Sequence, residues 1–355
     1  MVYISLKNYY IIYKYIWRLE MNSSMQKINV GVVGYGPLGK SCVEQIKLRK
    51  HEFKLVETFS RRATMRDPLN DEFLVPVYKI GDYANKLDVV LFCNDQINDL
   101  RDSSVHKPFF VPLINEKGIS TVDGYNNKGE MRNENYQNAV RHVTNKSGTT
   151  AIYGAGWIGY LSINKLLQRA MLPAAAINDF YGATPTGTYS LVHTNIVKQI
   201  KGVHDAYVKT TMDSTAQEGA LNGILVPESE RQNLYVSVIC KQEDFEFIKD
   251  EIVNTPYYFA NQKVHVTLAN KRSLASLYKN NSKYDADLIA VNKGTNAHVR
   301  VKFSMEDNPS AKAGAMLAYA KANVKMQQNN QRGVYHVADV PPSCLLSKEE
   351  FFANL

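Results

Sequence analysis

Short apolar runs alternate with longer amphipathic stretches between residue 27 and about residue 155. The apolar runs have the length of strands and lie at residues 28–33, 54–59, 87–93, 119–122 and 150–153. The run at 87–93 is almost continuously apolar, which is typical of a parallel strand covered on both faces. Residues 37–48 place Leu38, Cys42 and Ile46 on one helical face. Strands separated by helices predict an α/β fold with a Rossmann-type, doubly wound parallel sheet.

The pattern changes after about residue 156. Polar and apolar residues then alternate at 206–212, 233–240 and 263–268, which indicates an antiparallel sheet with one solvated face in an inserted α+β domain. A long helix is predicted to run to about Met326, with Asn308 as N-cap and Pro309 at the first helical position. We expect this helix and the tail to return to the first domain. The expected domains are therefore 26–155 completed by 310–355, and 156–309.

The first 24 residues differ from the rest of the chain. Tyrosines and isoleucines dominate residues 1–18, but Lys7 and Lys14 interrupt them. The stretch is too short for a membrane span, and it lacks the small-residue cleavage site of a signal peptide. We interpret 1–24 as a non-globular leader ahead of a start at Met21 or Met25. A membrane-surface anchor is the alternative.

Composition narrows the class of protein. The 355 residues are 45% hydrophobic and 21% charged, as in ordinary globular proteins. The net charge of +8 is spread along the chain, and no helix-turn-helix, zinc-finger or RNP-type motif accompanies it, so we expect no nucleic-acid partner. Cys42, Cys93, Cys240 and Cys344 stand singly, without metal-ligand spacing. We therefore expect no metal, no membrane partner and a reducing, cytoplasmic location.

A glycine-rich turn joins the first predicted strand to the first predicted helix. It reads Gly34, Tyr35, Gly36, Pro37, Leu38 and Gly39, which matches G-x-G-x-x-G. In this motif Gly34 permits the tight turn, Gly36 lets a pyrophosphate approach the backbone, and Gly39 lets helix and strand pack closely. The pyrophosphate would lie at the positive end of the helix. The turn therefore predicts a dinucleotide site.

The end of the second predicted strand indicates which dinucleotide binds. An NAD site usually places an acidic residue there, about 20 residues beyond the motif. Here Ser60 is followed by Arg61 and Arg62, and guanidinium groups suit the 2′-phosphate of NADP. Glu57 lies slightly earlier and argues for NAD, but we expect its side chain to point away. The alternative is that the two arginines form a solvated turn.

These two segments, GYGPLGKS and FSRRAT, resemble the start of the meso-diaminopimelate D-dehydrogenase family. The resemblance extends from about residue 28 to about residue 346. It implies NADP-dependent oxidative deamination at the D-centre of meso-2,6-diaminopimelate, giving L-2-amino-6-oxopimelate and ammonia. It also implies a Rossmann domain, an inserted domain for substrate binding and dimerisation, and a homodimer. Further shared segments lie at 121–125, 156–157, 161–164, 180–182, 231–232, 308–309 and 342–347.

The resemblance assigns cofactor contacts to four segments. Besides the glycine turn they are Ser60 with Arg61 and Arg62, the loop of Cys93, Asn94, Asp95 and Gln96, and finally Gly124 with Tyr125. The last two segments follow predicted strands, at the sheet edge where a nicotinamide should lie.

The resemblance also assigns substrate contacts. Those for the carboxylate of the non-reacting centre are Arg231, Thr210 and Asn308, with Tyr284 at the position of a family histidine. Each has an ordinary structural alternative: a surface arginine, a β-branched strand residue and a helix cap. The remaining predicted contacts are Trp157, Tyr181 and Ser190. His193 follows in the same loop as Ser190, and we expect it to have a structural role rather than a role in acid–base catalysis.

Two departures affect the reacting centre. The family has aspartates where this chain has Asn126 and Ile158, so Asn126 holds the expected catalytic position but cannot act as a general base. Loss of one acid–base group commonly slows a reaction about 10²–10⁴-fold. Asp95 or Asp123 are candidates to replace the missing charge. The alternatives to the family reaction are a dehydrogenase of another amino or keto acid, a non-catalytic NADP-binding protein, and another Rossmann-type reductase.

Overall fold

The computed structural model describes residues 27–60, 74–93, 110–124, 134–182, 187–256, 258–279, 284–346 and 348–354. The leader predicted at 1–24 lies outside these residues. Within them, no helix is long and apolar enough to cross a lipid bilayer.

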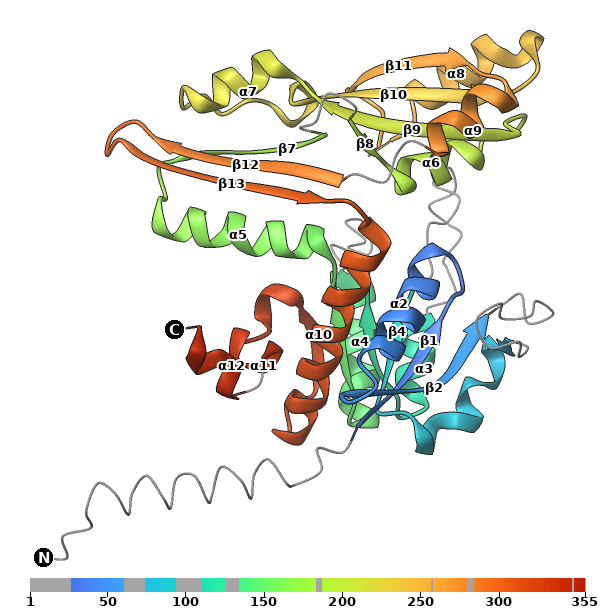
Figure 1. Cartoon of the computed structure of the whole chain (residues 1–355), viewed down its shortest axis with the longest axis vertical. Helices are drawn as coiled ribbons and strands as arrows, with labels where there is room; N and C mark the ends of the chain where they lie inside the picture. Colours follow the sequence, from blue (N-terminus) through green and yellow to red (C-terminus); the bar gives the residue numbers. More distant parts are fainter. Residues whose placement is uncertain are drawn as a thin grey trace, which may run out of the picture.

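A parallel sheet of seven strands forms the lower half of the molecule in Figure 1. Its spatial order is β14-β6-β5-β4-β1-β2-β3, and neighbouring strands pair in parallel. Strand order reverses between β1 and β4, which is the position where doubly wound sheets bind dinucleotides. The predicted α/β class is confirmed. The strands are β1 (Ile28–Val33), β2 (Phe53–Ser60), β3 (Val75–Pro76), β4 (Val89–Phe92), β5 (Ser120–Asp123), β6 (Thr150–Tyr153) and β14 (Gly333–His336).

Helices cover both faces of this sheet because successive strand residues point to opposite sides. Val30 and Val32 pack with α2 (Pro37–Leu48) and α10 (Asn308–Gln328), whereas Val33 packs on the opposite face. That opposite face is covered by η1 (Val77–Lys86), α3 (Phe110–Glu116) and α4 (Glu134–Ser147). The last described helices are α11 (Pro342–Leu345) and α12 (Lys348–Ala353), after a short turn η4 (Val337–Asp339).

Helix α10 differs from its prediction at its first residue. The N-cap is Asp307, with extended backbone (φ −131°, ψ 101°), and Asn308 is already helical. Pro309 was predicted at the first helical position and is instead the second residue of the helix, still in the first turn, where its missing N–H costs no hydrogen bond. Sequence cannot separate two adjacent capping residues, because Asp and Asn are both good N-caps.

The inserted region holds two further sheets, drawn in the upper half of Figure 1. Helix α5 (Trp157–Met171) leads from β6 to an antiparallel sheet of order β13-β12-β7. A second sheet has the order β11-β10-β9-β8. The strands are β7 (Ala176–Tyr181), β12 (Tyr284–Asn292), β13 (Ala297–Met305), β8 (Thr188–Tyr189), β9 (Asp205–Met212), β10 (Gln232–Ile239) and β11 (Lys263–Leu268). Helices and turns between them are α6 (Leu191–Lys198), α7 (Ser214–Leu221), η2 (Glu228–Glu230), η3 (Gln242–Asp244), α8 (Phe245–Val253) and α9 (Lys271–Lys279).

The prediction of a wholly antiparallel sheet in this region is wrong for one strand. β11 pairs with β10 in parallel, with Asn233 opposite Lys263. Parallel neighbours need a crossover connection, and α8 supplies it between the two strands. The polar–apolar alternation of β11 fits either direction of pairing, so the pattern alone does not reveal it.

Candidate functional site

The glycine turn leaves β1 and enters α2 through backbone contacts. Gly34 has a φ of 97°, in the region that favours glycine. A Cβ on Gly39 would lie 1.9 Å from the carbonyl oxygen of Gly34, so turn and helix touch at this point. Around Gly36 a Cβ would meet no atom of the described residues within 4 Å. Gly36 is also the N-cap of α2 and has no side chain to bond the first N–H groups. The turn thus presents an open backbone surface at a helix N-terminus.

Side chains of the turn point into the protein. Tyr35 and Leu38 are each 5% exposed and belong to the core shared by α2 and α10. Lys40 Nζ lies 5.4 Å from the centroid of the Tyr35 ring. A dinucleotide here would therefore meet the backbone of residues 34–39 more than the side chains of Tyr35 and Leu38, and Pro37 in the first helical turn offers no N–H.

The end of β2 lies beside the turn, since Gly34 donates its N–H to the carbonyl oxygen of Phe59 at 2.8 Å. Ser60 is the last residue of β2 and is 4% exposed. The carboxylate of Glu57 accepts a hydrogen bond from the N–H of Thr58 at 2.8 Å. Arg61 and Arg62 lie outside the described residues, so the proposed 2′-phosphate contacts stay predictions.

The carboxyl ends of β4 and β5 form the next part of the same edge. Cys93 follows β4, and its Sγ lies 3.5 Å from Cys42 Sγ. Burial raises the pKa of the Cys93 thiol, and the bond to Cys42 adds to this, so the thiol stays protonated and unreactive. Gly124 follows β5, where a Cβ would lie 2.6 Å from Met316 Sδ. The described residues end there: Asn94, Asp95, Gln96, Tyr125 and Asn126 lie outside them.

Across this edge an aromatic cluster marks the predicted substrate side. Trp157, the first residue of α5, makes edge contacts with Tyr181 (5.7 Å between ring centroids) and Tyr284 (6.1 Å). Its indole stacks on Phe303 at 6.1 Å. The cluster draws its four rings from α5, β7, β12 and β13, and all three predicted aromatic contacts lie in it. Phe303 was not predicted.

Tyr284 connects this cluster to the start of α10. Burial raises the pKa of its hydroxyl, which hydrogen bonds with the side chain of Asn308 and the backbone of Leu191. The side-chain oxygen Oδ1 of Asn308 is buried and finds no hydrogen-bond partner among the described residues. Asn308 does not cap α10, and it instead brings to the cluster an acceptor with no hydrogen-bond partner among the described residues.

Arg231 has a partner that sequence did not reveal. It is 8% exposed; its Nε donates to the carbonyl oxygen of Val226 at 2.8 Å and its Nη1 donates to Asp179 Oδ1 at 2.5 Å. Asp179 also accepts from Lys165 Nζ at 3.0 Å and from the Tyr181 hydroxyl at 3.3 Å. Burial works to raise the pKa of Asp179, but Lys165 and Arg231 outweigh it and hold the pKa below its usual value. The guanidinium predicted to bind a substrate carboxylate thus already contacts a carboxylate of the chain.

The two other predicted contacts belong to β9 of the second sheet and to the start of α6, the helix that follows β8. Ser190 is the N-cap of α6, and its Oγ lies 2.6 Å from His193 Nδ1. The His193 ring also makes an edge contact with Phe259 at 5.2 Å, which favours the structural role. Thr210 is 5% exposed on β9, and its carbonyl oxygen would lie 2.1 Å from a Cβ on Gly182. Thr210 therefore lies where β7 and β9 approach closely.

The described residues hold no group of three or more His, Cys, Asp or Glu side chains placed to bind a metal. The arrangement offers an open helix N-terminus for an anion, a partly buried aromatic cluster across the same edge, and the amide oxygen of Asn308, which has no partner among the described residues. Asp179, Lys165 and Phe303 were missed from sequence because they are spread over β7, α5 and β13, and no local pattern distinguishes them from ordinary strand and helix residues.

Known proteins resemble this chain along most of its length. Residues 156–308 match the family described as diaminopimelic acid dehydrogenase C-terminal domain. Meso-diaminopimelate D-dehydrogenase of Acetivibrio thermocellus is 28% identical over 341 residues, covering 92% of this chain and 96% of that protein. The protein of the same name from Corynebacterium glutamicum is 27% identical over 335 residues, covering 92% and 97%.

Solved structures also resemble this chain over most of its length. The C. glutamicum diaminopimelate dehydrogenase in complex with diaminopimelate superposes with a TM-score of 0.81 at 25% identity, over 93% of this chain and 99% of that one. An engineered D-amino acid dehydrogenase bound to NADP+ has a TM-score of 0.78 at 24% identity, over 92% and 99%, and shares the fold.

Proposed function

We propose that this chain is a member of the diaminopimelate dehydrogenase family and an NADP-dependent oxidoreductase acting on a CH–NH2 group, as its similarity to these proteins over most of its length supports. Its substrate in this proposal is meso-2,6-diaminopimelate, which it converts reversibly to L-2-amino-6-oxopimelate and ammonia. The observation that carries the proposal is the pairing of the open glycine turn with the aromatic cluster at one edge of the sheet.

The residues present fit NADP. The positive φ of Gly34, the contact of Gly39 with Gly34 and the open space around Gly36 suit close approach of a pyrophosphate. The N-terminal end of α2 adds backbone N–H groups that have no partner within the helix, together with a partial positive charge. In this proposal Ser60, at the end of β2, and the two arginines that follow it in the sequence, Arg61 and Arg62, bind the 2′-phosphate.

The chain's own residues would place the substrate. Trp157, Tyr181 and Tyr284 form an apolar wall that excludes water and packs along the aliphatic part of a long amino acid. Oδ1 of Asn308 is an acceptor for the ammonium of the non-reacting centre. Asp123, 7% exposed at the end of β5, is the carboxylate we assign to proton transfer during imine hydrolysis. When bound, NADP+ supplies the acceptor for the hydride that leaves the reacting carbon.

A second candidate is a dehydrogenase of another amino or keto acid. The pairing of Arg231 with Asp179 favours it, because a guanidinium that already holds a carboxylate is less available to a substrate carboxylate. A substrate whose side chain carries no carboxylate would not need to contact Arg231.

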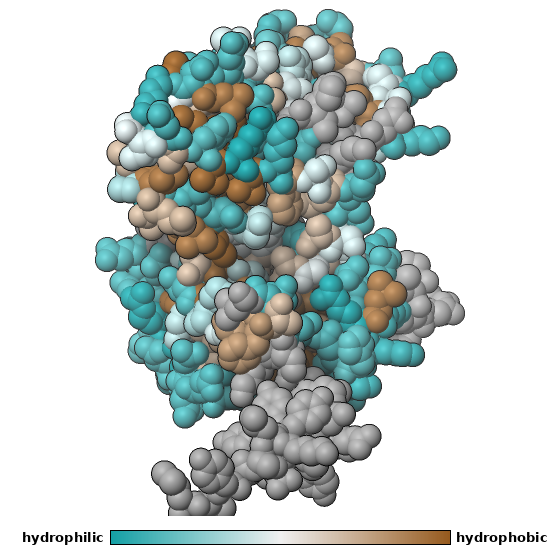
Figure 2. Space-filling view, turned by 60° about the vertical axis from the view of Figure 1, so that its left-hand side comes forward, coloured by the Kyte–Doolittle hydropathy of each residue, from teal (hydrophilic) through white to brown (hydrophobic). Residues whose placement is uncertain are grey.

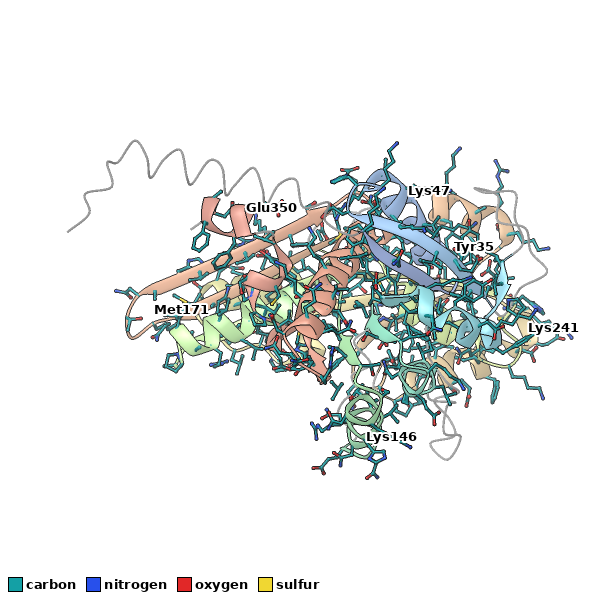
Figure 3. All side chains as sticks on the ribbon, turned by 90° about the horizontal axis from the view of Figure 1, so that it is seen from below. Tyr35, Lys47, Lys146, Met171, Lys241 and Glu350 are labelled. Atoms are coloured by element: carbon teal, nitrogen blue, oxygen red, sulfur yellow. The ribbon has the colours of Figure 1, made fainter. Side chains whose placement is uncertain are left out.

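A homodimer and a cytoplasmic location belong to the same proposal. The outer face of α5 exposes Tyr160 (47%), Leu167 (56%) and Met171 (77%), at the i, i+7 and i+11 positions of one helical face. Figure 2 shows apolar side chains gathered on the side that carries α5, β12 and β13, and Figure 3 places Met171 at the molecule's edge, far from Tyr35. Exposed stripes of this kind favour a subunit interface. We expect Leu167→Glu to yield monomers in analytical ultracentrifugation, while Leu48→Glu, an exposed leucine on α2, leaves the dimer intact.

The test of the activity has two steps. NADPH and NADH binding are measured first by titration, and NADPH is expected to bind at least tenfold more tightly, since Arg61 and Arg62 can pair with the 2′-phosphate. Reduction of NADP+ with meso-diaminopimelate is then followed by absorbance, beside other D-amino acids. Equal binding of the two cofactors would overturn the NADP assignment. Tight NADPH binding with turnover of a different amino acid alone would establish the second candidate.

A further inference from the structure

One carboxylate joins the aromatic cluster to a buried arginine. Asp179 lies two residues before Tyr181 on β7 and accepts a hydrogen bond from the Tyr181 hydroxyl at 3.3 Å. The ring of Tyr181 also contacts Trp157, so a single side chain separates Trp157 from Asp179. The same carboxylate accepts a hydrogen bond from Nη1 of Arg231. The ion pair therefore lies next to the place where the proposed function puts the amino acid.

Arg231 uses only part of its hydrogen-bonding capacity. It donates from Nε to the carbonyl oxygen of Val226 and from Nη1 to Asp179. A guanidinium has more N–H donors than these, and Nη2 makes no hydrogen bond within the part of the chain that the structure describes. The side chains of Arg231 and Asp179 are 10% and 14% exposed, so neither is fully sealed. A second carboxylate therefore has donors to bond on Arg231.

Asp179 has another cation besides Arg231. Lys165, on α5, donates from Nζ to Asp179 at 3.0 Å, and its side chain is 41% exposed. Burial acts to raise the pKa of Asp179, and Lys165 opposes this more strongly than Arg231 does, so the pKa lies below its usual value. Lys165 and the Tyr181 hydroxyl thus keep the charge of Asp179 paired when Arg231 bonds another carboxylate.

We propose that the carboxylate of the substrate's non-reacting centre replaces Asp179 on Arg231, while Lys165 retains Asp179. Asp179 is then a competitor built into the chain, and it sets how strongly the site prefers an amino acid with two carboxylates. The inference rests on the proposed function and deepens it, since it names a residue that determines specificity at the far end of the substrate. The exchange puts one carboxylate in place of another on the same guanidinium, so no buried charge loses its partner.

The neighbouring strand shows a contrasting arrangement. Asp287, on β12, is 1% exposed and bonds Nε of Arg300 through both of its oxygens, at 3.0 Å each. Gln217 adds a neutral donor at 2.8 Å, and among the described residues no lysine pairs with Asp287. Release of Arg300 would leave this carboxylate buried without a cation. The pair on β12 is therefore fixed, whereas Asp179 divides its bonds between two cations.

The test compares two ligands that differ in one group. D-Lysine is meso-2,6-diaminopimelate without the carboxylate of the non-reacting centre. Protein loaded with NADPH oxidises neither amino acid because its cofactor is already reduced, and binding to this complex is measured by calorimetry. We expect Asp179→Asn to bind meso-diaminopimelate about tenfold more tightly than the parent, because a neutral amide competes weakly for a guanidinium. D-Lysine affinity should change by less than about twofold.

Lys165→Met tests the exchange in the opposite direction, at a more exposed position. Without Lys165, Asp179 depends on Arg231, so meso-diaminopimelate affinity should fall about tenfold while D-lysine affinity stays unchanged. In the Asp179→Asn background the same substitution should have no effect on either ligand, since the lysine acts through Asp179. An equal loss in both backgrounds would mean that Lys165 binds the substrate directly, and the proposal would then be wrong.

Asp287→Asn is the matched control. It removes a buried carboxylate from an arginine on the adjacent strands and should leave the affinity for both amino acids unchanged. The proposal is overturned if Asp179→Asn binds meso-diaminopimelate no more tightly than the parent, because the pair with Arg231 would then be fixed. An equal gain for D-lysine, or in Asp287→Asn, would contradict it as well. A parent that binds NADPH but neither amino acid overturns the proposed function, and the exchange with it.

Discussion

The cofactor turn acts through its backbone, whereas the substrate cluster acts through side chains from several separate elements. Six consecutive residues form the turn. Two positions in it require glycine: Gly34, because its φ is positive, and Gly39, because it packs against the carbonyl oxygen of Gly34. The cluster around Trp157 joins α5, β7, β12 and β13. Backbone sites tolerate change in neighbouring side chains but not in their glycines. Composite sites can change their substrate through single side chains while the fold persists.

Gly39→Ala should have the largest effect of the substitutions we consider. The new Cβ would lie 1.9 Å from a backbone oxygen that cannot move without moving β1. We expect the free energy of unfolding to fall by about 4 kcal/mol or more, and NADPH affinity to fall with it. Thermal unfolding and NADPH titration measure both.

Gly36→Ala is the control for this substitution. Its Cβ would meet no described atom within 4 Å, so stability should stay within about 1 kcal/mol of the parent while NADPH affinity falls at least tenfold. If the two variants lost stability equally, the backbone contact of Gly39 would not be the cause.

Asp179→Asn tests the substrate side. It leaves Arg231 buried without a full charge partner, and we expect a loss of about 3 kcal/mol in denaturant unfolding. Asp213→Asn is the matched control in a more exposed pair, with Lys263 at 2.8 Å, and should cost less than about 1 kcal/mol. NADPH affinity should stay unchanged in both, because neither residue belongs to the turn. A loss of NADPH affinity in Asp179→Asn would mean that the two regions are coupled.

The same carboxylate gives a pH dependence. The pKa of Asp179 is lowered in the folded state, so its stabilising contribution is complete above the unfolded-state pKa of about 4. That contribution is lost as pH falls from about 4 through the lowered pKa. The stability difference between the parent and Asp179→Asn should be constant from about pH 5 to pH 7 and should shrink below about pH 4. A difference that grew on acidification would contradict the assignment.

Tyr284→Phe should have the smallest effect. It removes the hydroxyl that bonds Asn308 and leaves the ring contact with Trp157 intact. We expect a cost of about 1 kcal/mol in stability. We also expect a higher KM for the amino acid with an unchanged KM for NADP+, since Asn308 would lose its orientation. A raised KM for NADP+ would place Tyr284 on the cofactor side instead.

Local features of the sequence predicted the fold well. The bounds of α2, β6 and β11 agree with the structure, because each depends on periodicity and turn residues within a few positions. The direction of β11 was not predicted, since it depends on where α8 carries the chain.

In the candidate site, too, local features could be predicted from the sequence and contacts between distant residues could not. The glycine turn could be recognised because its six residues are consecutive. The contact of Arg231 with Asp179 joins residues 52 apart, and the contact of Lys165 with Asp179 depends on how α5 packs against β7. Side chains of this kind resemble ordinary surface lysines and strand aspartates until the pairing of distant elements is known.

The return of the chain through α10 and β14 has a consequence for synthesis. β14 is the edge strand of the seven-stranded sheet and pairs with β6, and α10 supplies Met316 and Leu317 to the core of the same sheet. While a ribosome is still translating the inserted region, the sheet exposes an unpaired strand edge and an uncovered apolar face. Such a nascent chain is open to edge-to-edge association. Chains that end before residue 308 should therefore bind chaperones and aggregate, even though every residue of the glycine turn has been made.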